Sequence, residues 1–248
     1  MFVCRFCIIK AFDLLILYID VHPVFLFFYY NNSFFHKTID SDFFKLLGLR
    51  SPGFFPAMLS SIGLTGTLFA GPIIQLFVQP STIDESQEMP SFLLSFRTLI
   101  AAPVTEEIVY RACLIPLLIN FRETEAQLIF TVPLFFGIAH THHLYEKIFI
   151  LKQDIKFSIF QTIIQLTYTT IFGAMSTFFY LRTAHLPAVI AMHSMCNYFG
   201  LPNFVRVWFE PNRLKRVVLV GFYVLGLVGF GFGCSLIKPL DYDNDVFY

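Results

Sequence analysis

The chain has 248 residues, of which 56% are hydrophobic and only 14% are charged. A soluble domain usually carries about 25% charged residues, so this composition favours a chain that is embedded in lipid. The formal net charge is zero, which gives no bulk attraction to nucleic acid, and we therefore expect no nucleic-acid partner.

The N-terminal part, residues 1–42, begins with an apolar segment at 11–30 and continues into a polar linker. Two aspartates and a histidine interrupt the apolar segment, and no small-residue cleavage site is clear after it. A signal peptide needs both an uninterrupted apolar region and such a cleavage site. We therefore interpret the segment as a first membrane helix or as a helix that lies at the interface.

Residues 43–237 contain several long apolar runs with few or no charges. A helix that spans a bilayer needs about 20 such residues, and backbone groups in hydrocarbon must form their hydrogen bonds internally. We therefore predict an all-α fold, a polytopic transmembrane helical bundle, over 43–237, followed by an acidic disordered tail at 238–248. The predicted helical segments are 54–78, 92–119 with a bend or restart at Pro103, 126–139, 157–181, 184–205 and 217–237.

Charged residues lie inside the segment 92–119, in the run TEEIVYR at 105–111. Glu107 and Arg111 are four residues apart and share one helical face, with the acid on the N-terminal side. Glu106 lies about 100° further around the helix, so it points elsewhere. This pattern predicts that Glu107 pairs with Arg111 and that Glu106 faces a polar cavity. A helix end whose charges reach interfacial water is the alternative.

Two further polar clusters follow. His140, His142 and His143 end the segment 126–139, and His193 and Asn197 are four residues apart in the segment 184–205. An imidazole and a carboxamide on one helical face are donors that can stabilise a developing oxyanion. The same two residue types also form hydrogen bonds between membrane helices, so a structural role stays open.

Two kinds of hydrolytic chemistry fit these clusters. Glu106, His140 and His193 form a reasonable set of zinc ligands if the fold brings them together, although the metalloprotease signature H-E-x-x-H is absent. Alternatively, without a metal, a glutamate and a histidine activate water while a second histidine and an asparagine polarise a carbonyl. Spacing alone does not choose between the two.

The three clusters together resemble the motifs of the CAAX prenyl protease 2 family, the Ras-converting enzymes, which are intramembrane proteases. The family motifs E-E-x-x-x-R, F-x-x-x-H and H-x-x-x-N match Glu106-Glu107-x-x-x-Arg111, Phe136-x-x-x-His140 and His193-x-x-x-Asn197. The resemblance covers about residues 43–237. The family usually has more membrane segments before this region than residues 1–42 provide, so we expect a shortened or divergent N-terminal part.

The resemblance implies the activity and the environment of the protein. It implies an endopeptidase that removes the C-terminal aaX tripeptide from farnesylated or geranylgeranylated CAAX proteins, such as Ras-like small GTPases. It also implies a multi-pass protein of the endoplasmic reticulum membrane, with a polar catalytic cavity inside the bilayer that opens to the cytosol. No cofactor is implied, and zinc is the alternative.

The resemblance also implies a role for each polar residue. Glu106 and His140 correspond to the pair that activates water. His193 and Asn197 correspond to the pair that holds the oxyanion. Glu107 and Arg111 correspond to supporting positions of the family's site, and His142 and His143 to secondary positions. Two alternative functions stay open. One is a zinc-dependent membrane metalloprotease that uses the same residues, and the other is a membrane scaffold or transporter without enzymatic activity. A common type of transporter would show inverted repeats, and we see none in the sequence.

Overall fold

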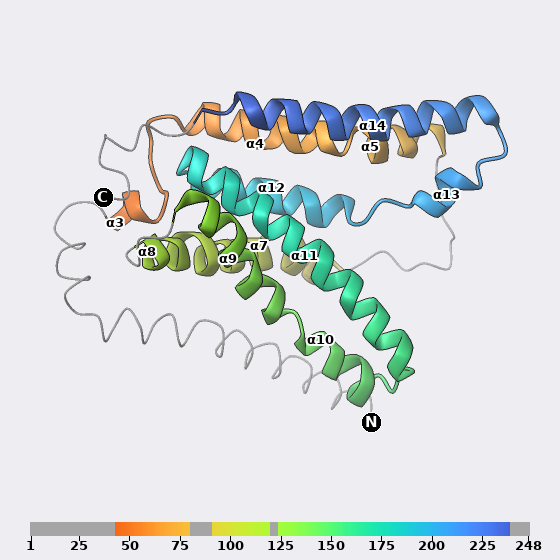
Figure 1. Ribbon diagram of the computed structural model, residues 1–248, viewed down its shortest axis with the longest axis horizontal. Helices are drawn as coiled ribbons and strands as arrows, with labels where there is room; N and C mark the ends of the chain where they lie inside the picture. The colour runs from red at the N-terminus through yellow and green to blue at the C-terminus, as the bar shows by residue number, and fades with distance from the viewer. Residues whose placement is uncertain (1–42, 80–90, 120–123, 239–248) are drawn as a thin grey trace. The chain divides into compact units, whose positions relative to one another are not determined.

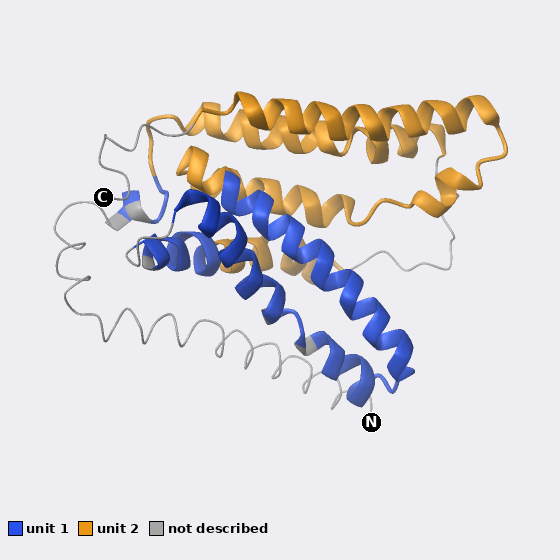
Figure 2. Ribbon diagram, viewed as in Figure 1, with its two compact units in different colours: residues 1–49, 108–178, 245–248 blue, residues 50–107, 179–244 orange. Residues whose placement is uncertain are grey.

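The computed structural model describes residues 43–79, 91–119 and 124–238 (Figure 1). The predicted N-terminal segment in 1–42 and the predicted acidic tail from residue 239 onward lie outside the described residues. Every regular element in the described part of the chain is a helix, which confirms the all-α prediction. The chain divides into two compact units, which Figure 2 shows in different colours. Unit 1 comprises 1–49, 108–178 and 245–248, and unit 2 comprises 50–107 and 179–244.

Unit 1 consists mainly of helices that pack around a small aromatic core. Its helices are α3 (Phe43–Leu46), η2 (Ile108–Cys113), α8 (Leu114–Ile119), α9 (Glu125–Ala139), α10 (His142–Tyr145), η3 (Glu146–Ile150) and most of α11 (Ile155–Thr183). The N-terminus of α9 is fixed by a capping box, in which the side chains of Thr124 and Gln127 satisfy each other's backbone N–H groups. Val132 and Phe136 of α9 are fully or almost fully buried. The apolar segment predicted at 126–139 is therefore a helix with one face in the core of this unit, while Phe130 and Ile138 are mostly exposed.

Unit 2 contains the long apolar helices of the chain. Its helices are α4 (Phe54–Leu68), α5 (Ala70–Val78), α6 (Phe92–Phe96), η1 (Arg97–Ala101), α7 (Ala102–Glu107), α12 (Leu186–Phe199), α13 (Phe204–Trp208) and α14 (Arg213–Leu236). Helix α14 packs along α4 and α5, and α12 packs against α4, η1 and α7. A Cβ atom at Gly226 would lie only 2.6 Å from the carbonyl oxygen of Thr67, so α14 and α4 approach closely there.

The segment predicted as one helix over 92–119 is helical, but it alternates between α-helical and π-helical stretches. The two π-helical stretches, η1 and η2, were not predicted. Pro103 is the second residue of α7, the helix that directly follows η1, and we predicted a bend or a restart at this proline. Proline has no backbone N–H and disrupts a regular α-helical ladder, which explains why the hydrogen-bond register changes at this point.

One described helix, α14, is long and apolar enough to cross a membrane. A second crossing is formed if α4 and α5, which meet at an angle of 55°, count as one broken span. The predicted segment 184–205 is the 14-residue helix α12, which is shorter than the roughly 20 residues that a straight span needs. The predicted segment 157–181 lies within α11, a 29-residue helix that contains many threonine and glutamine residues.

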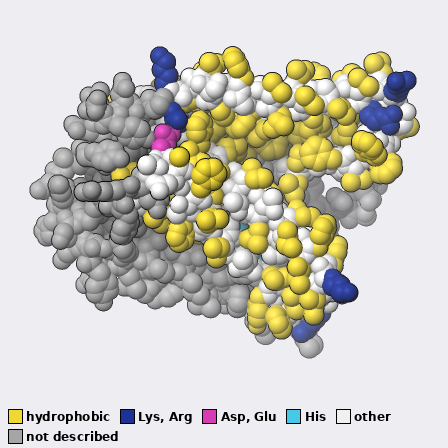
Figure 3. Space-filling view, in the orientation of Figure 1, with side chains coloured by type: hydrophobic (Ala, Val, Ile, Leu, Met, Phe, Trp, Pro, Cys, Tyr) yellow, Lys and Arg dark blue, Asp and Glu magenta, His cyan; other side chains and the backbone are white. Residues whose placement is uncertain are grey.

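After its basic first turn, α14 exposes mainly apolar side chains. Leu225, Leu227 and Val228 are each about two-thirds exposed. On the face drawn in Figure 3, hydrophobic side chains cover much of the region of α14. Apolar patches of this extent are rare on soluble monomers, and they mark surfaces that contact lipid or another protein.

A buried polar network joins α5 to the region of α13 and α14 within unit 2. Gln75 accepts a hydrogen bond from the hydroxyl of Tyr223 and donates one to Gln79. Gln79 in turn donates to the carboxylate of Glu210, and this hydrogen bond lowers the pKa of Glu210. The network therefore fixes the end of α5 against the turn that leads into α14.

Candidate functional site

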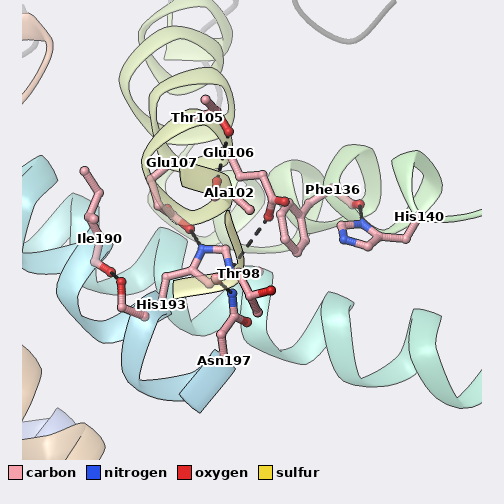
Figure 4. A network of polar contacts seen from close by, with 12 residues as sticks. Thr98, Ala102, Thr105, Glu106, Glu107, Phe136, His140, Ile190, His193 and Asn197 are labelled. Atoms are coloured by element: carbon pink, nitrogen blue, oxygen red, sulfur yellow. Dashed lines mark hydrogen bonds and ion pairs between the residues drawn. The ribbon is translucent and has the colours of Figure 1, made fainter. Parts of the chain in front are cut away.

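The site in unit 2 is built around His193, which contacts both glutamates of the first motif (Figure 4). Its Nδ1 atom lies 2.7 Å from Oε1 of Glu107, which is hydrogen-bonding distance. Its Nε2 atom lies 3.7 Å from Oε2 of Glu106, which is an ion-pair distance but too long for a hydrogen bond. The imidazole of His193 thus faces a carboxylate at each ring nitrogen.

The two glutamates differ in their exposure to solvent. The side chain of Glu107 is fully buried, whereas 31% of the side chain of Glu106 is exposed. A buried carboxylate needs strong hydrogen-bond partners, and His193 Nδ1–H supplies one for Glu107. Glu106 keeps access to solvent, as expected for a carboxylate that must reach a water molecule. The two glutamates thus differ in burial, while the predicted pairing of Glu107 with Arg111 and the predicted polar cavity at Glu106 stay predictions.

The contact between Glu107 and His193 determines what His193 can do. Because Glu107 is an acceptor when ionised, Nδ1 of His193 carries a hydrogen and donates it. The Nε2 atom is then a proton acceptor when the ring is neutral and a second donor when the ring is protonated. A protonated ring can offer Nε2–H to a developing negative charge while Glu107 balances its positive charge.

Asn197 and His193 lie four residues apart on α12, and both contact the segment formed by η1 and α7. The carboxamide nitrogen of Asn197 donates to the backbone carbonyl oxygen of Thr98 in η1, at 2.9 Å. This partner was not predicted. The carboxamide nitrogen carries two hydrogens, so this bond uses only one of them.

In unit 1, His140 follows the last residue of α9 and is oriented by its own helix. Its Nδ1 atom lies 2.7 Å from the carbonyl oxygen of Phe136. A carbonyl oxygen can only accept, so Nδ1 carries the hydrogen and Nε2 keeps a lone pair in the neutral ring. Such a tautomer suits a general base at Nε2. The residue four positions before the histidine thus supplies the orienting carbonyl, and the ring centre of Phe136 also lies 4.7 Å from that of His140.

Arg111 is fully buried in unit 1 and holds the core of that unit together. Its Nη2 atom donates to the carbonyl oxygen of Gly173 at 3.2 Å. Its guanidinium carbon lies 5.0 Å from the ring centre of Phe136 and 5.9 Å from that of Phe172. Cation–π contacts of this kind favour arginine over lysine. The pairing of Arg111 with Glu107 stays a prediction from their spacing.

The other two histidines of the second cluster lie just after His140 in the chain, and the ring centre of His143 is 6.1 Å from that of His140. His143 pairs with Glu146 of η3 through Nδ1, at 3.2 Å, and His142 is the first residue of α10. Among the residues that the structure describes, no group of three or more His, Cys, Asp or Glu side chains is arranged to hold a metal ion. The proposed zinc ligands Glu106 and His193 belong to unit 2 and His140 to unit 1.

Sequence reasoning missed three contacts that shape the site: Glu107 with His193, Asn197 with Thr98, and Arg111 with Phe136 and Phe172. Each joins residues that are at least 25 positions apart in the chain, since they lie on different helices. Spacing along one helix cannot reveal such pairs. A weak signal for the second contact was Pro103, because a proline inside a helix leaves a carbonyl without its usual donor.

Comparisons with known proteins identify relatives of the chain. The family model described as type II CAAX prenyl endopeptidase Rce1-like matches residues 88–199, which include Glu106, His140 and Asn197. The chain is 35% identical over 206 residues to CAAX prenyl protease 2 of Homo sapiens, covering 79% of this chain and 60% of that protein. It is 33% identical over 222 residues to CAAX prenyl protease 2 of Arabidopsis thaliana, covering 79% of this chain and 68% of that protein.

A relative in Saccharomyces cerevisiae, also named CAAX prenyl protease 2, is 30% identical over 186 residues, covering 65% of this chain and 59% of that protein. The chain therefore spans about 60% of the length of the human and yeast relatives. No solved structure matches the chain. The three motifs and their placement on helices, the family match and the identity to the plant relative agree, and the chain belongs to the Rce1-like type II CAAX prenyl endopeptidase family.

Proposed function

We propose that the protein is an endopeptidase that removes the C-terminal aaX tripeptide from prenylated CAAX proteins. The observation that carries the proposal is the arrangement around His193, whose ring is held by the buried Glu107 and faces the accessible Glu106. This arrangement occurs in a chain whose relatives are named CAAX prenyl protease 2. The substrates that follow from these names are farnesylated or geranylgeranylated proteins, including Ras-like small GTPases.

In the proposed mechanism, Glu106 and His140 activate one water molecule as general bases. The water oxygen attacks the carbonyl carbon of the prenylated cysteine, and its proton passes to the Glu106 carboxylate or to Nε2 of His140. The carbonyl oxygen becomes negatively charged in the tetrahedral intermediate. The carbon–nitrogen bond then breaks, and the same proton goes to the amine of the leaving tripeptide. The mechanism requires that Glu106 and His140 share the attacking water.

His193 and Asn197 stabilise the oxyanion in this proposal. Protonated His193 offers Nε2–H, because its Nδ1–H is already donated to Glu107. Asn197 offers the second hydrogen of its carboxamide nitrogen, since the first is donated to Thr98. Donors that are fixed before the charge develops lower the barrier without reorganisation during the reaction. Glu107 and Arg111 act as supporting residues, Glu107 by orienting His193 and Arg111 by holding the core of unit 1.

The proposed setting is the endoplasmic reticulum membrane, with residues 43–237 as one polytopic membrane domain. The spanning length of α14, the broken pair α4–α5 and the exposed apolar side chains of α14 support this setting. An isoprenoid chain partitions into lipid, so a membrane enzyme meets the scissile bond near bilayer depth. The catalytic cavity would open to the cytosol, from which the protein part of the substrate arrives.

Hydrolysis of a synthetic peptide tests the proposal. Purified protein in detergent or nanodiscs is incubated with a farnesylated CAAX peptide and, in parallel, with the same peptide without the farnesyl group. We expect release of the intact tripeptide from the farnesylated peptide only, detected by mass spectrometry. Equal cleavage of both peptides would contradict the prenyl specificity, and no cleavage of either would contradict the proposed activity.

We further propose that the reaction uses no metal, and zinc bound by Glu106, His140 and His193 is the competing mechanism. Two experiments distinguish the metal-free mechanism from the zinc mechanism: elemental analysis of active protein, and cleavage assays after treatment with a chelator. We expect the treated enzyme to keep most of its activity, and we expect added zinc not to restore activity to His193→Ala. Stoichiometric zinc that is lost in His193→Ala would establish the zinc mechanism instead.

A further inference from the structure

The hydrogen-bond register of η1 leaves one carbonyl oxygen without a backbone donor. The N–H of Ala102 donates to the carbonyl oxygen of Arg97, five residues earlier, as in a π-helix. In the same register, the next donor would be the nitrogen of residue 103, and its acceptor would be the carbonyl oxygen of Thr98. Residue 103 is proline and has no N–H to donate.

Asn197 supplies the missing hydrogen bond from another helix. Its carboxamide nitrogen donates to the carbonyl oxygen of Thr98 at 2.9 Å, and α12 packs against both η1 and α7. In the close-up view, Asn197 and Thr98 point toward each other, and His193 lies nearby on the same helix as Asn197 (Figure 4). Thr98 is exposed in unit 2, and in the proposed membrane setting lipid offers no replacement donor to its carbonyl oxygen, so this contact favours the π turn.

The π turn sets the direction of the two glutamates. Helix α7 has only six residues and carries Glu106 and Glu107 at its C-terminal end. A π turn contains one more residue than an α turn. Reversion of η1 to α-helical hydrogen bonding would therefore rotate α7 by about one residue position, which is about 100°. Glu107 would then turn away from His193, and the carboxylates of Glu106 and Glu107 would no longer face the two ring nitrogens of His193.

We propose that Asn197 is a positioning residue, which holds the π turn of η1 open by replacing the hydrogen bond that Pro103 cannot make. Through this turn, Asn197 fixes the rotation of α7 and therefore the direction of Glu106 and Glu107 toward His193. The proposal adds a role to Asn197 beside contact with the oxyanion, and its catalytic consequence rests on the proposed function. The structural part of the proposal, the coupling of Asn197 to Pro103, does not depend on the reaction.

A double-mutant cycle between Asn197 and Pro103 tests this coupling. Pro103→Ala restores an N–H at residue 103, which can donate to Thr98 in the π register. We expect Asn197→Ala to lower kcat by about 10²–10³-fold with little change in KM. In the Pro103→Ala background, we expect the same Asn197→Ala change to lower kcat at least tenfold less, and to lower the unfolding temperature less. The matched control is Pro133→Ala, a proline inside α9, which should leave the effect of Asn197→Ala unchanged.

Two outcomes would overturn the proposal. The first is that Asn197→Ala lowers kcat and the unfolding temperature equally, whether residue 103 is proline or alanine. This result would leave Asn197 with a contact to the oxyanion as its only role. If Asn197→Ala does not fold, we expect Pro103→Ala/Asn197→Ala to recover folding, and failure to recover would be the second contradiction. A wild-type protein that does not cleave the farnesylated peptide contradicts the proposed function only, because the unfolding temperatures still report the coupling.

Discussion

At the scale of single residues, the structure assigns Glu107 a partner that explains why two adjacent glutamates are present. Glu107 is fully buried and its hydrogen bond to His193 fixes which ring nitrogen carries a hydrogen. A pair of this kind is costly to break, because one polar group is then left buried without its partner. In the proposed mechanism, the adjacent and more exposed Glu106 is the carboxylate that activates water.

Two substitutions at Glu107 separate its charge from its hydrogen bond. Glu107→Gln keeps an oxygen that accepts from His193 but removes the negative charge, whereas Glu107→Leu removes both. We expect Glu107→Leu to lower the free energy of unfolding by about 3 kcal/mol and Glu107→Gln to lower it by much less. We expect both to reduce kcat. Equal free energies of unfolding for wild type and Glu107→Leu would show that this contact does not hold the site.

His140 and His143, both in the second cluster, should differ in their importance for catalysis. The orienting contact of His140 with the carbonyl oxygen of Phe136 suits a general base, and His143 is paired with Glu146 on a partly exposed surface. We expect His140→Ala to reduce kcat by about 10²–10⁴-fold and His143→Ala to reduce it by less than about tenfold, in cleavage assays of folded protein. A similar loss in both variants would indicate a wider catalytic or metal-binding cluster.

At the scale of elements, the packing of α14 on α4 can be tested at one glycine of α14, with a second glycine of the same helix as the control. An added Cβ at Gly226 would lie 2.6 Å from the backbone oxygen of Thr67, whereas one at Gly221 would meet no atom within 4 Å. We expect Gly226→Ala to lower the free energy of unfolding by about 1–3 kcal/mol through overpacking. Gly221→Ala should be neutral or should stabilise α14 by up to about 1 kcal/mol.

Thermal unfolding of both variants in detergent measures the difference. If Gly226→Ala unfolds at the same temperature as Gly221→Ala, the packing of α14 on α4 is looser than the structure shows.

The sequence predicted the helices that are long apolar runs, but it did not predict the contacts between helices. Apolar runs predicted α4–α5, α11, α12 and α14, because a helix in an apolar setting needs little more than length and composition. The i,i+4 spacing predicted that His193 and Asn197 share one face of their helix, but it did not predict which segment they contact. The π turns could not be predicted, because they depend on a donor from a distant helix as well as on Pro103. The partner of Glu107 is likewise decided by packing between helices.

At the scale of the whole molecule, the basic stretch from α13 to the first turn of α14 predicts the orientation of the protein in the membrane. Arg206, Arg213, Lys215 and Arg216 are exposed and lie within 11 residues of one another, with Glu210 as the one acid among them. Short basic loops next to a spanning helix remain in the cytosol. We expect a cysteine at Leu214, in a background without native cysteines, to react with a membrane-impermeant maleimide in intact microsomes.

A cysteine at Leu236, at the other end of α14, is the control and should react only after the membrane is permeabilised. The reverse labelling pattern would place the basic loop in the lumen and would contradict the proposed orientation.

The central claim is that Glu106 activates the water that cleaves a prenylated CAAX substrate. The most direct test is the kcat of Glu106→Gln on the farnesylated peptide, beside wild type and Glu146→Gln, a glutamate that pairs with His143 instead. We expect Glu106→Gln to lose at least about 10²-fold in kcat at an unchanged unfolding temperature, and Glu146→Gln to remain close to wild type. Near-normal turnover by folded Glu106→Gln would contradict the account.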